Sequence, residues 1–275
     1  MIVLNEGSKR SYEVGKQVAE TERYRLYLCR PSGETADHLL QVASKVEHNG
    51  ALDRDAYILE RLLREAQRLE EEYAGVKTKS NHLLNYQLSF PALVDTFVPA
   101  DQGHRRVNIL RFREVDDVRK LVPLHNLAHR DRLRVDLRTS VWIMGKLLKT
   151  LTFTEAARTI VGNLTLGNIL IEPDQHYVVI FDWADAQLTN GHIPRSMVCD
   201  EIRSAARGVI EVLGGTMEEG IPDDGSAEHA RYEKHLVQLA QSGESDAFTA
   251  HQSFYTLVDS LWPRGFHQFT MLPRR

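Results

Sequence analysis

Between residues 11 and 46 the chain alternates between hydrophobic and polar residues. Residues 24–28 alternate in this way, a Pro-Ser-Gly turn follows at 31–33, and residues 38–46 are again mostly apolar. Alternation with a period of two, bounded by turn residues, is typical of half-buried strands. We therefore expect a series of strands and turns between Ser11 and Val46.

The spacing then changes from that of strands to that of a helix. Between Asp53 and Tyr73, leucine and isoleucine residues recur every three or four positions, while Arg and Glu residues occupy the other faces. This spacing predicts a long amphipathic helix. Two further strands are expected over Pro91–Val98 and Arg106–Phe112, joined by a polar turn at 99–103. Together these pieces predict a small sheet with one helix.

The second half of the chain is mainly helical in pattern. Apolar residues recur at helical spacing from Leu137 to Leu151, and two short apolar runs at 169–171 and 177–181 flank a polar turn, which predicts a β-hairpin. The aromatic stretch Trp262–Phe269 is expected to cap this half. Further helices are expected over 200–213, 227–241 and 249–261.

Composition excludes several classes of protein. The chain has 275 residues, 42% of them hydrophobic, which is enough for a large core, and its net charge of −4 argues against nucleic acid as a partner. Cys29 and Cys199 lack the spacing of a disulfide scaffold or a zinc site. No secretory signal and no membrane span of about 18 apolar residues is expected. We therefore expect a cytoplasmic globular protein.

The chemically most informative string lies just before the predicted hairpin. Residues 161–171 read Val-Gly-Asn-Leu-Thr-Leu-Gly-Asn-Ile-Leu-Ile, and residues 179–184 read Val-Ile-Phe-Asp-Trp-Ala. The first string resembles the catalytic loop of the protein-kinase-like superfamily, H-[RG]-D-L-x-x-x-N-I-L. The second resembles the hydrophobic-D-[FW]-G turn of the same superfamily.

The resemblance implies a site for ATP and Mg²⁺. Asn168 and Asp182 match the two positions whose oxygen atoms hold Mg²⁺ on the phosphates in this superfamily. Asn168 follows Asn163 by five residues, which is the spacing of the motif, and Asp182 comes fourteen residues later. We therefore expect Asn168 and Asp182 to be metal ligands.

Three residues of these strings depart from the superfamily pattern. Val161 replaces the histidine, Ala184 replaces the usual glycine, and Asn163 replaces the aspartate that accepts the substrate proton. A neutral amide cannot act as that base. Asn163 is therefore expected to occupy the catalytic position in a degenerate form.

Other superfamily positions are assigned by the same resemblance. Val-Ala-Ser-Lys at 42–45 is similar to the strand motif V-A-x-K, so Lys45 is expected to contact the nucleotide and to pair with Glu65 on the long helix. Gly15 is the one glycine left where a glycine-rich loop is expected. Asp200 resembles the aspartate that braces the catalytic loop from a helix.

The fold implied is α+β and bilobal, as in protein kinases. A small antiparallel sheet with one long helix would form the N-lobe, residues 1–113, and a mainly helical C-lobe would span 114–275, the two making one continuous domain. Three hypotheses for function remain open. The chain is a pseudokinase that binds ATP and Mg²⁺ weakly or not at all and acts through an unknown protein partner; a divergent, active phosphotransferase acting on a protein or a small molecule; or an interaction module that binds no nucleotide.

Overall fold

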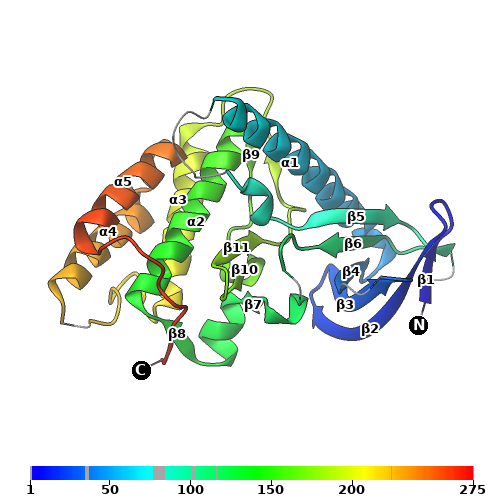
Figure 1. The fold of residues 1–275 in the computed structure, drawn as a ribbon, viewed down its shortest axis with the longest axis horizontal. Coiled ribbons are helices and arrows are strands. Elements are labelled where there is room, and N and C mark those ends of the chain that lie inside the picture. Colours follow the sequence, from blue (N-terminus) through cyan, green and yellow to red (C-terminus); the bar gives the residue numbers. More distant parts are fainter. Residues whose placement is uncertain are drawn as a thin grey trace. The chain divides into compact units, whose positions relative to one another are not determined.

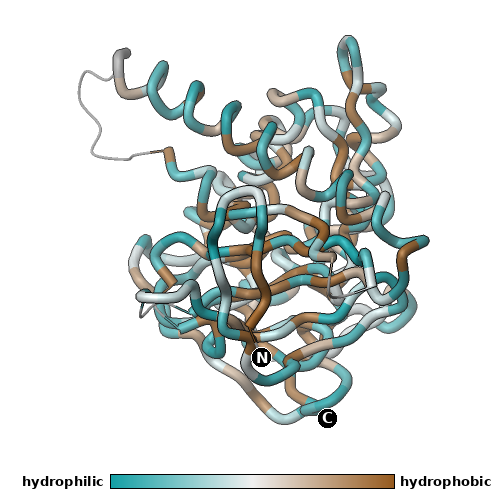
Figure 2. Tube along the Cα trace, turned by 90° about the vertical axis from the view of Figure 1, so that its right-hand side faces the viewer, coloured by the Kyte–Doolittle hydropathy of each residue, from teal (hydrophilic) through white to brown (hydrophobic). Residues whose placement is uncertain are grey.

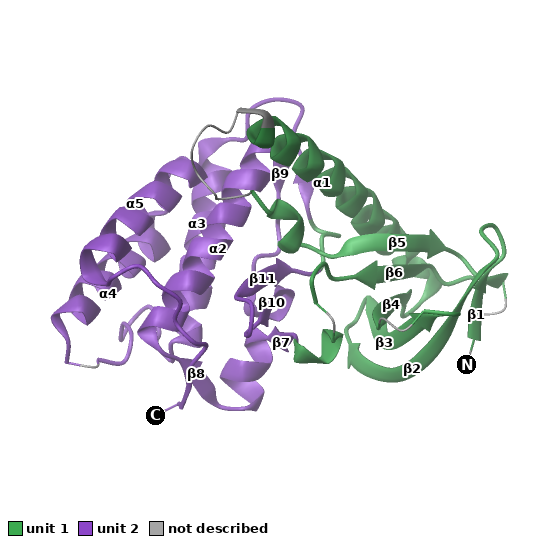
Figure 3. Ribbon diagram, in the orientation of Figure 1, with its two compact units in different colours: residues 1–120, 182–185 green, residues 121–181, 186–275 purple. Residues whose placement is uncertain are grey.

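The computed structural model describes residues 2–34, 37–76, 84–100, 103–115, 117–223 and 225–274. The chain divides into two compact units (Figure 3). The first comprises residues 1–120 together with the short segment 182–185, and the second comprises residues 121–181 and 186–275. The expected lobe boundary after residue 113 stays a prediction.

An antiparallel six-stranded sheet forms most of the first unit, with the strand order β1-β2-β3-β4-β6-β5 (Figure 1). Five strands confirm the expected series, whereas the edge strand β1 was not predicted, because its single short apolar run is too brief to show a period. The bounds are β1 Ile2–Asn5, β2 Arg10–Glu20, β3 Tyr24–Pro31, β4 His38–Ala43, β5 Ala92–Phe97 and β6 Val107–Arg111.

Asp95 links the two edges of this sheet. Its carboxylate, on edge strand β5, accepts hydrogen bonds from Asn5 Nδ2 of β1 at 2.9 Å and from the Tyr12 hydroxyl of β2 at 2.8 Å. Asn5 and Tyr12 are both buried. The strands at opposite ends of the hydrogen-bonding order are thus joined by side chains, which indicates that the sheet curls on itself.

The long helix α1 (Asn49–Val76) packs on β4, β5 and β6. Leu59 and Leu62 of the predicted apolar stripe are fully buried, as is Leu52 just before it, and hydrophilic residues recur on successive turns of the same helix (Figure 2). The amphipathic helix is therefore confirmed, and it extends a few residues beyond each predicted end.

Four helices form the framework of the second unit, with α2 packed on α3 and α5, and α3 packed on α4. Their bounds are α2 Leu137–Ala156, α3 Arg195–Val212, α4 Ala227–Ser242 and α5 Ala247–Leu261. All four confirm the helical spacing read from the sequence. None of the helices described here combines the length and apolar character needed to cross a membrane.

Short strands complete the second unit. The predicted hairpin is confirmed as β10 and β11, which pair in antiparallel register and are extended by β7. The aromatic tail packs on the same unit, where the Trp262 ring lies 5.7 Å from that of Tyr232. The bounds are β7 Val122–Pro123, β8 Leu133–Val135, β9 Thr159–Ile160, β10 Ile169–Glu172, β11 Tyr177–Ile180, β12 Gln187–Leu188 and β13 Met271–Pro273.

Candidate active site

The loop that resembles a catalytic loop joins β9 to β10 in the second unit. Asn168 Nδ2 donates a hydrogen bond to the main-chain oxygen of Asn163 at 2.9 Å, and the main-chain oxygen of Asn168 accepts one from Phe181 N at 3.0 Å. The Asn163 side chain is half-buried, and its Oδ1 accepts a hydrogen bond from Thr165 Oγ1 at 3.2 Å. The loop is thus held in a defined shape, with an uncharged amide where the resemblance places the catalytic base.

Glu201 of α3 braces this loop from within the second unit. Its Oε1 accepts hydrogen bonds from Val161 N at 2.7 Å and from Gly162 N at 3.1 Å. Burial raises the pKa of Glu201 to about 7, although the two amides act in the opposite direction. The expectation that Asp200 fills this role is wrong, because Asp200 points to solvent and pairs with Arg203.

The segment 182–185 belongs to the first unit and is anchored there by Trp183. The indole is completely buried, and its ring meets that of Phe90 edge-on at 6.3 Å. Trp183 N also donates a hydrogen bond to Asp55 Oδ1 of α1 at 2.8 Å. The turn expected from the sequence is therefore fixed to α1 by its main chain and to Phe90 by its ring.

Asp55 is a buried acid that the sequence reading did not single out. It is 1% exposed, and its Oδ2 has no hydrogen-bond partner among the described residues. Burial raises the pKa of Asp55 to about 8, and the negative charge of Asp182 adds to the rise. Both effects favour the protonated carboxyl group at neutral pH. Asp55 follows Leu52 by three residues and precedes Leu59 by four, so it lies on the apolar face of the helix. This spacing is the feature of the sequence that indicates its burial.

Lys45 and Glu65 are not brought together. Lys45 is exposed and lies beyond the end of β4, because Ser44 already bends away from the strand. Glu65 lies 16 residues beyond the first residue of α1, roughly 24 Å along the helix axis at 1.5 Å per residue. It pairs with Arg68 of the same helix at 3.0 Å. The expected ion pair is therefore absent from the described structure.

An amide occupies the inner position of β4, the strand that leads to α1. Gln41 is 1% exposed, and its Oε1 accepts a hydrogen bond from Asn108 Nδ2 at 3.1 Å. The same Nδ2 donates to the Leu52 oxygen of α1 at 3.0 Å, and the Asn108 side chain also interacts with Asp55. No residue of β4 is Lys or Arg. The sheet therefore contacts α1 here through the amide side chains of Gln41 and Asn108 and the buried carboxyl group of Asp55.

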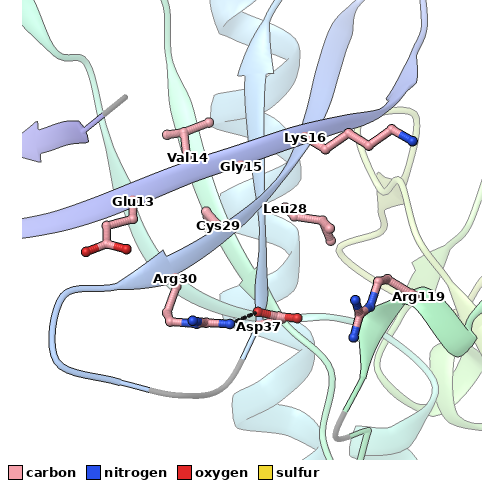
Figure 4. Close-up of a pocket in the computed structure, with 9 residues that line it drawn as sticks. All are labelled: Glu13, Val14, Gly15, Lys16, Leu28, Cys29, Arg30, Asp37 and Arg119. Carbon is pink, nitrogen blue, oxygen red and sulfur yellow. Dashed lines mark hydrogen bonds and ion pairs between the residues drawn. The ribbon is translucent and has the colours of Figure 1, made fainter.

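Gly15 lies inside β2 and not in the β2–β3 turn, which is formed by residues 21–23. It lines a pocket of about 340 Å³ in the first unit (Figure 4). A Cβ atom at Gly15 would lie 3.3 Å from the Leu28 oxygen, so the position favours a small residue. The pocket is lined by Glu13, Val14, Gly15, Lys16, Leu28, Cys29, Arg30, Asp37 and Arg119.

The surroundings of Asp182 are a poor fit for the Mg²⁺ ion that the resemblance implies. Asp182 is 8% exposed, its Oδ1 accepts a hydrogen bond from Ala184 N at 2.9 Å, and the Tyr24 hydroxyl donates another to its carboxylate. Burial raises the pKa of Asp182, and the positive charge of Arg23 acts in the opposite direction. A hard divalent ion would have to compete with these donors and would be repelled by the cation. The joint metal role of Asn168 and Asp182 stays a prediction, since they belong to different units.

Comparison with solved structures identifies the fold. No protein-family model and no curated protein matches the chain. The structure of vaccinia related kinase 3 matches with a TM-score of 0.58 and 14% identity, over 95% of this chain and 90% of that chain. The BubR1 kinase domain matches with a TM-score of 0.62 and 11% identity, over 94% of this chain and 83% of that chain.

A bacterial kinase domain gives a similar result. A double mutant of the PknI kinase domain of Mycobacterium tuberculosis matches with a TM-score of 0.55 and 14% identity, over 91% of this chain and 95% of that chain. At these identities the likeness concerns the fold alone. The chain therefore has a bilobal, α+β, protein-kinase-like fold.

Proposed function

We propose that the chain is a pseudokinase, a kinase-like protein that does not transfer phosphate and acts through contacts with another protein. The proposal depends mainly on Gln41. In protein kinases the strand before the long helix carries a lysine that contacts the phosphates and pairs with a glutamate of that helix. Here that strand carries a buried amide, and the acid on the helix is Asp55, which is neutral at pH 7.

Asn163 supports the same proposal independently. Phosphoryl transfer relies on positioning and electrostatic stabilisation, with a carboxylate orienting the attacking hydroxyl group. Asn163 is uncharged, and its Oδ1 is already hydrogen-bonded to Thr165. Neither of the two described positions, 41 and 163, therefore supplies the charge that phosphoryl transfer would need there. The two losses lie in different units, so one local rearrangement does not repair both.

We propose further that ATP with Mg²⁺ binds weakly or not at all. The turn between β2 and β3 contains no glycine, so its backbone lacks the close approach that glycine-rich loops give to phosphates. Both cysteines are unpaired, which fits our proposal of a cytoplasmic protein. Without chemistry at the site, the remaining role for a folded kinase-like domain is to bind a protein partner.

A titration with ATP, with and without Mg²⁺, tests the nucleotide part of this proposal. A ligand stabilises the folded state by RT ln(1 + [L]/Kd), which is about 0.4 kcal/mol when its concentration equals Kd. We expect millimolar ATP to shift the melting temperature of the wild type by no more than about 1 °C. In Gln41→Lys, where an ammonium group joins Asp55 and Asn108, we expect a larger shift with ATP.

Gln187→Lys is the matched control for this titration, since it adds the same charge at an exposed position of β12. It should respond to ATP as the wild type does. A wild-type shift of several degrees that saturates with ATP and requires Mg²⁺ would contradict the proposed weak binding.

A further inference from the structure

The turn between β2 and β3 is tied to the end of β4. Within the turn, Thr21 N donates a hydrogen bond to the Tyr24 oxygen at 2.8 Å. Ser44 N donates to the Arg23 oxygen at 2.9 Å, and Ser44 Oγ donates to the Glu22 oxygen. The turn is therefore held by hydrogen bonds at three successive residues, and the side chain of Arg23 leaves it from a defined point.

Arg23 connects this turn to the segment 182–185, which belongs to the same unit. Its Nη2 forms an ion pair with Asp185 Oδ2 at 2.8 Å, and both side chains are 38% exposed. The guanidinium also attracts the carboxylate of Asp182, and the next residue, Tyr24, donates its hydroxyl to that carboxylate. Arg23 of the turn therefore supplies a cation to Asp185, and Tyr24, the first residue of β3, supplies a hydroxyl donor to Asp182.

We propose that Arg23 takes the place of the metal ion at Asp182. In a protein kinase this aspartate holds Mg²⁺, whose charge neutralises the carboxylate and the phosphates. Here a guanidinium from the chain itself, held by its ion pair with Asp185 three residues further on, supplies positive charge that acts on the same carboxylate. A divalent cation that approached Asp182 would be repelled by Arg23 and would have to displace the Tyr24 and Ala184 donors.

The inference deepens the proposed function, because it explains how segment 182–185 keeps its shape without nucleotide or metal. It is tested with the metal alone, so the result is independent of any transfer of phosphate. The probe is Mn²⁺, whose free concentration is measured by electron spin resonance in the absence of ATP. The variant is Arg23→Met, which removes the charge and keeps most of the aliphatic stem that packs beside the segment.

We expect the wild type to show no Mn²⁺ binding that depends on Asp182, and Arg23→Met to bind Mn²⁺ at least about tenfold more tightly. Adding Asp182→Asn to Arg23→Met should abolish the gained binding. Arg25→Met is the control, because Arg25 is similarly exposed and its ion pair is with Glu20 at 2.9 Å, away from the segment. It should behave as the wild type does.

Two results would overturn the inference. One is Mn²⁺ binding by the wild type that Asp182→Asn removes, which requires only folded wild-type protein and this single variant. The other is a folded Arg23→Met protein that gains no binding. If Arg23→Met does not fold, Arg23→Gln provides the same test, because glutamine also removes the charge but ends in a polar amide. A chain that binds Mn²⁺ but transfers no phosphate would refute the role of Arg23 and leave the pseudokinase proposal standing.

Discussion

Replacing Glu201 with alanine is expected to lower the free energy of unfolding by about 3 kcal/mol, because two backbone donors lose their acceptor inside the second unit. Val161 N and Gly162 N both donate to Glu201 Oε1, and the side chain is 8% exposed, so water does not readily replace it. Glu201→Gln keeps an acceptor oxygen and should cost much less. Chemical denaturation monitored by circular dichroism measures the three stabilities.

Asp200→Ala is the matched control for this prediction, since it removes a carboxylate from the adjacent residue of the same helix. The side chain of Asp200 is 63% exposed and pairs only with Arg203 within α3. Such exposed pairs contribute about 0.5 kcal/mol, so the variant should be close to the wild type. Equal losses of stability in Asp200→Ala and Glu201→Ala would show that Glu201 has no special role in bracing the loop.

Asp55→Asn is expected to stabilise the protein increasingly as pH rises from about 4 to about 8, and to have little effect below pH 4. In the unfolded chain an aspartate titrates near its ordinary pKa of about 3.9, whereas burial raises the pKa of Asp55 to about 8 in the fold. Between these two values the folded state binds more protons than the unfolded state, so the stability of the wild type falls as pH rises. Above pH 8 the wild type carries the full free-energy cost of burying the charged carboxylate of Asp55.

The asparagine avoids this penalty because it carries no charge at any pH. Its Oδ1 can still accept the hydrogen bond from Trp183 N. At pH 9 we expect Asp55→Asn to exceed the wild type by about 2 kcal/mol or more. Asp53→Asn, at an exposed position two residues earlier, is the control and should show no such gain. Parallel stability profiles for Asp55→Asn and the wild type from pH 5 to 9 would argue against a buried, protonated Asp55.

The fold could be predicted from the sequence because its elements are amphipathic. Leu52, Leu59 and Leu62 mark one face of α1, and each main helix of the second unit shows a similar stripe. Burial of such a stripe requires a regular helix, so the period of the sequence and the structure agree. The edge strand β1 escaped prediction, since only Val3 and Asn5 of its four residues are buried.

The candidate site was harder to predict, because motif spacing does not define side-chain direction. Lys45 matched a lysine motif, but the strand ends at Ala43, and the inward position is Gln41. Glu201 was overlooked in favour of Asp200, although successive helical residues point about 100° apart. Val198 and Ile202, at helical spacing on the buried face, would have identified Glu201 as the inward residue.

The departures from the kinase pattern are the most consistent part of the site. Asn163, Gln41 and Arg23 each change the charge at a position that matters for phosphoryl transfer: a lost carboxylate, a lost ammonium and an added guanidinium. Gln41 and Arg23 act against the binding of a metal–nucleotide complex, and Asn163 acts against the transfer step, so all three changes oppose phosphoryl transfer. This agreement supports the pseudokinase proposal more strongly than any single residue.

The most direct test is transfer of labelled γ-phosphate from ATP by the purified wild type, to itself or to a generic protein acceptor, with Mg²⁺ or Mn²⁺ present. The pseudokinase proposal predicts that label is incorporated no faster by the wild type than by Asp182→Ala. Transfer by the wild type that Asp182→Ala abolishes would contradict it and would establish the chain as an active phosphotransferase.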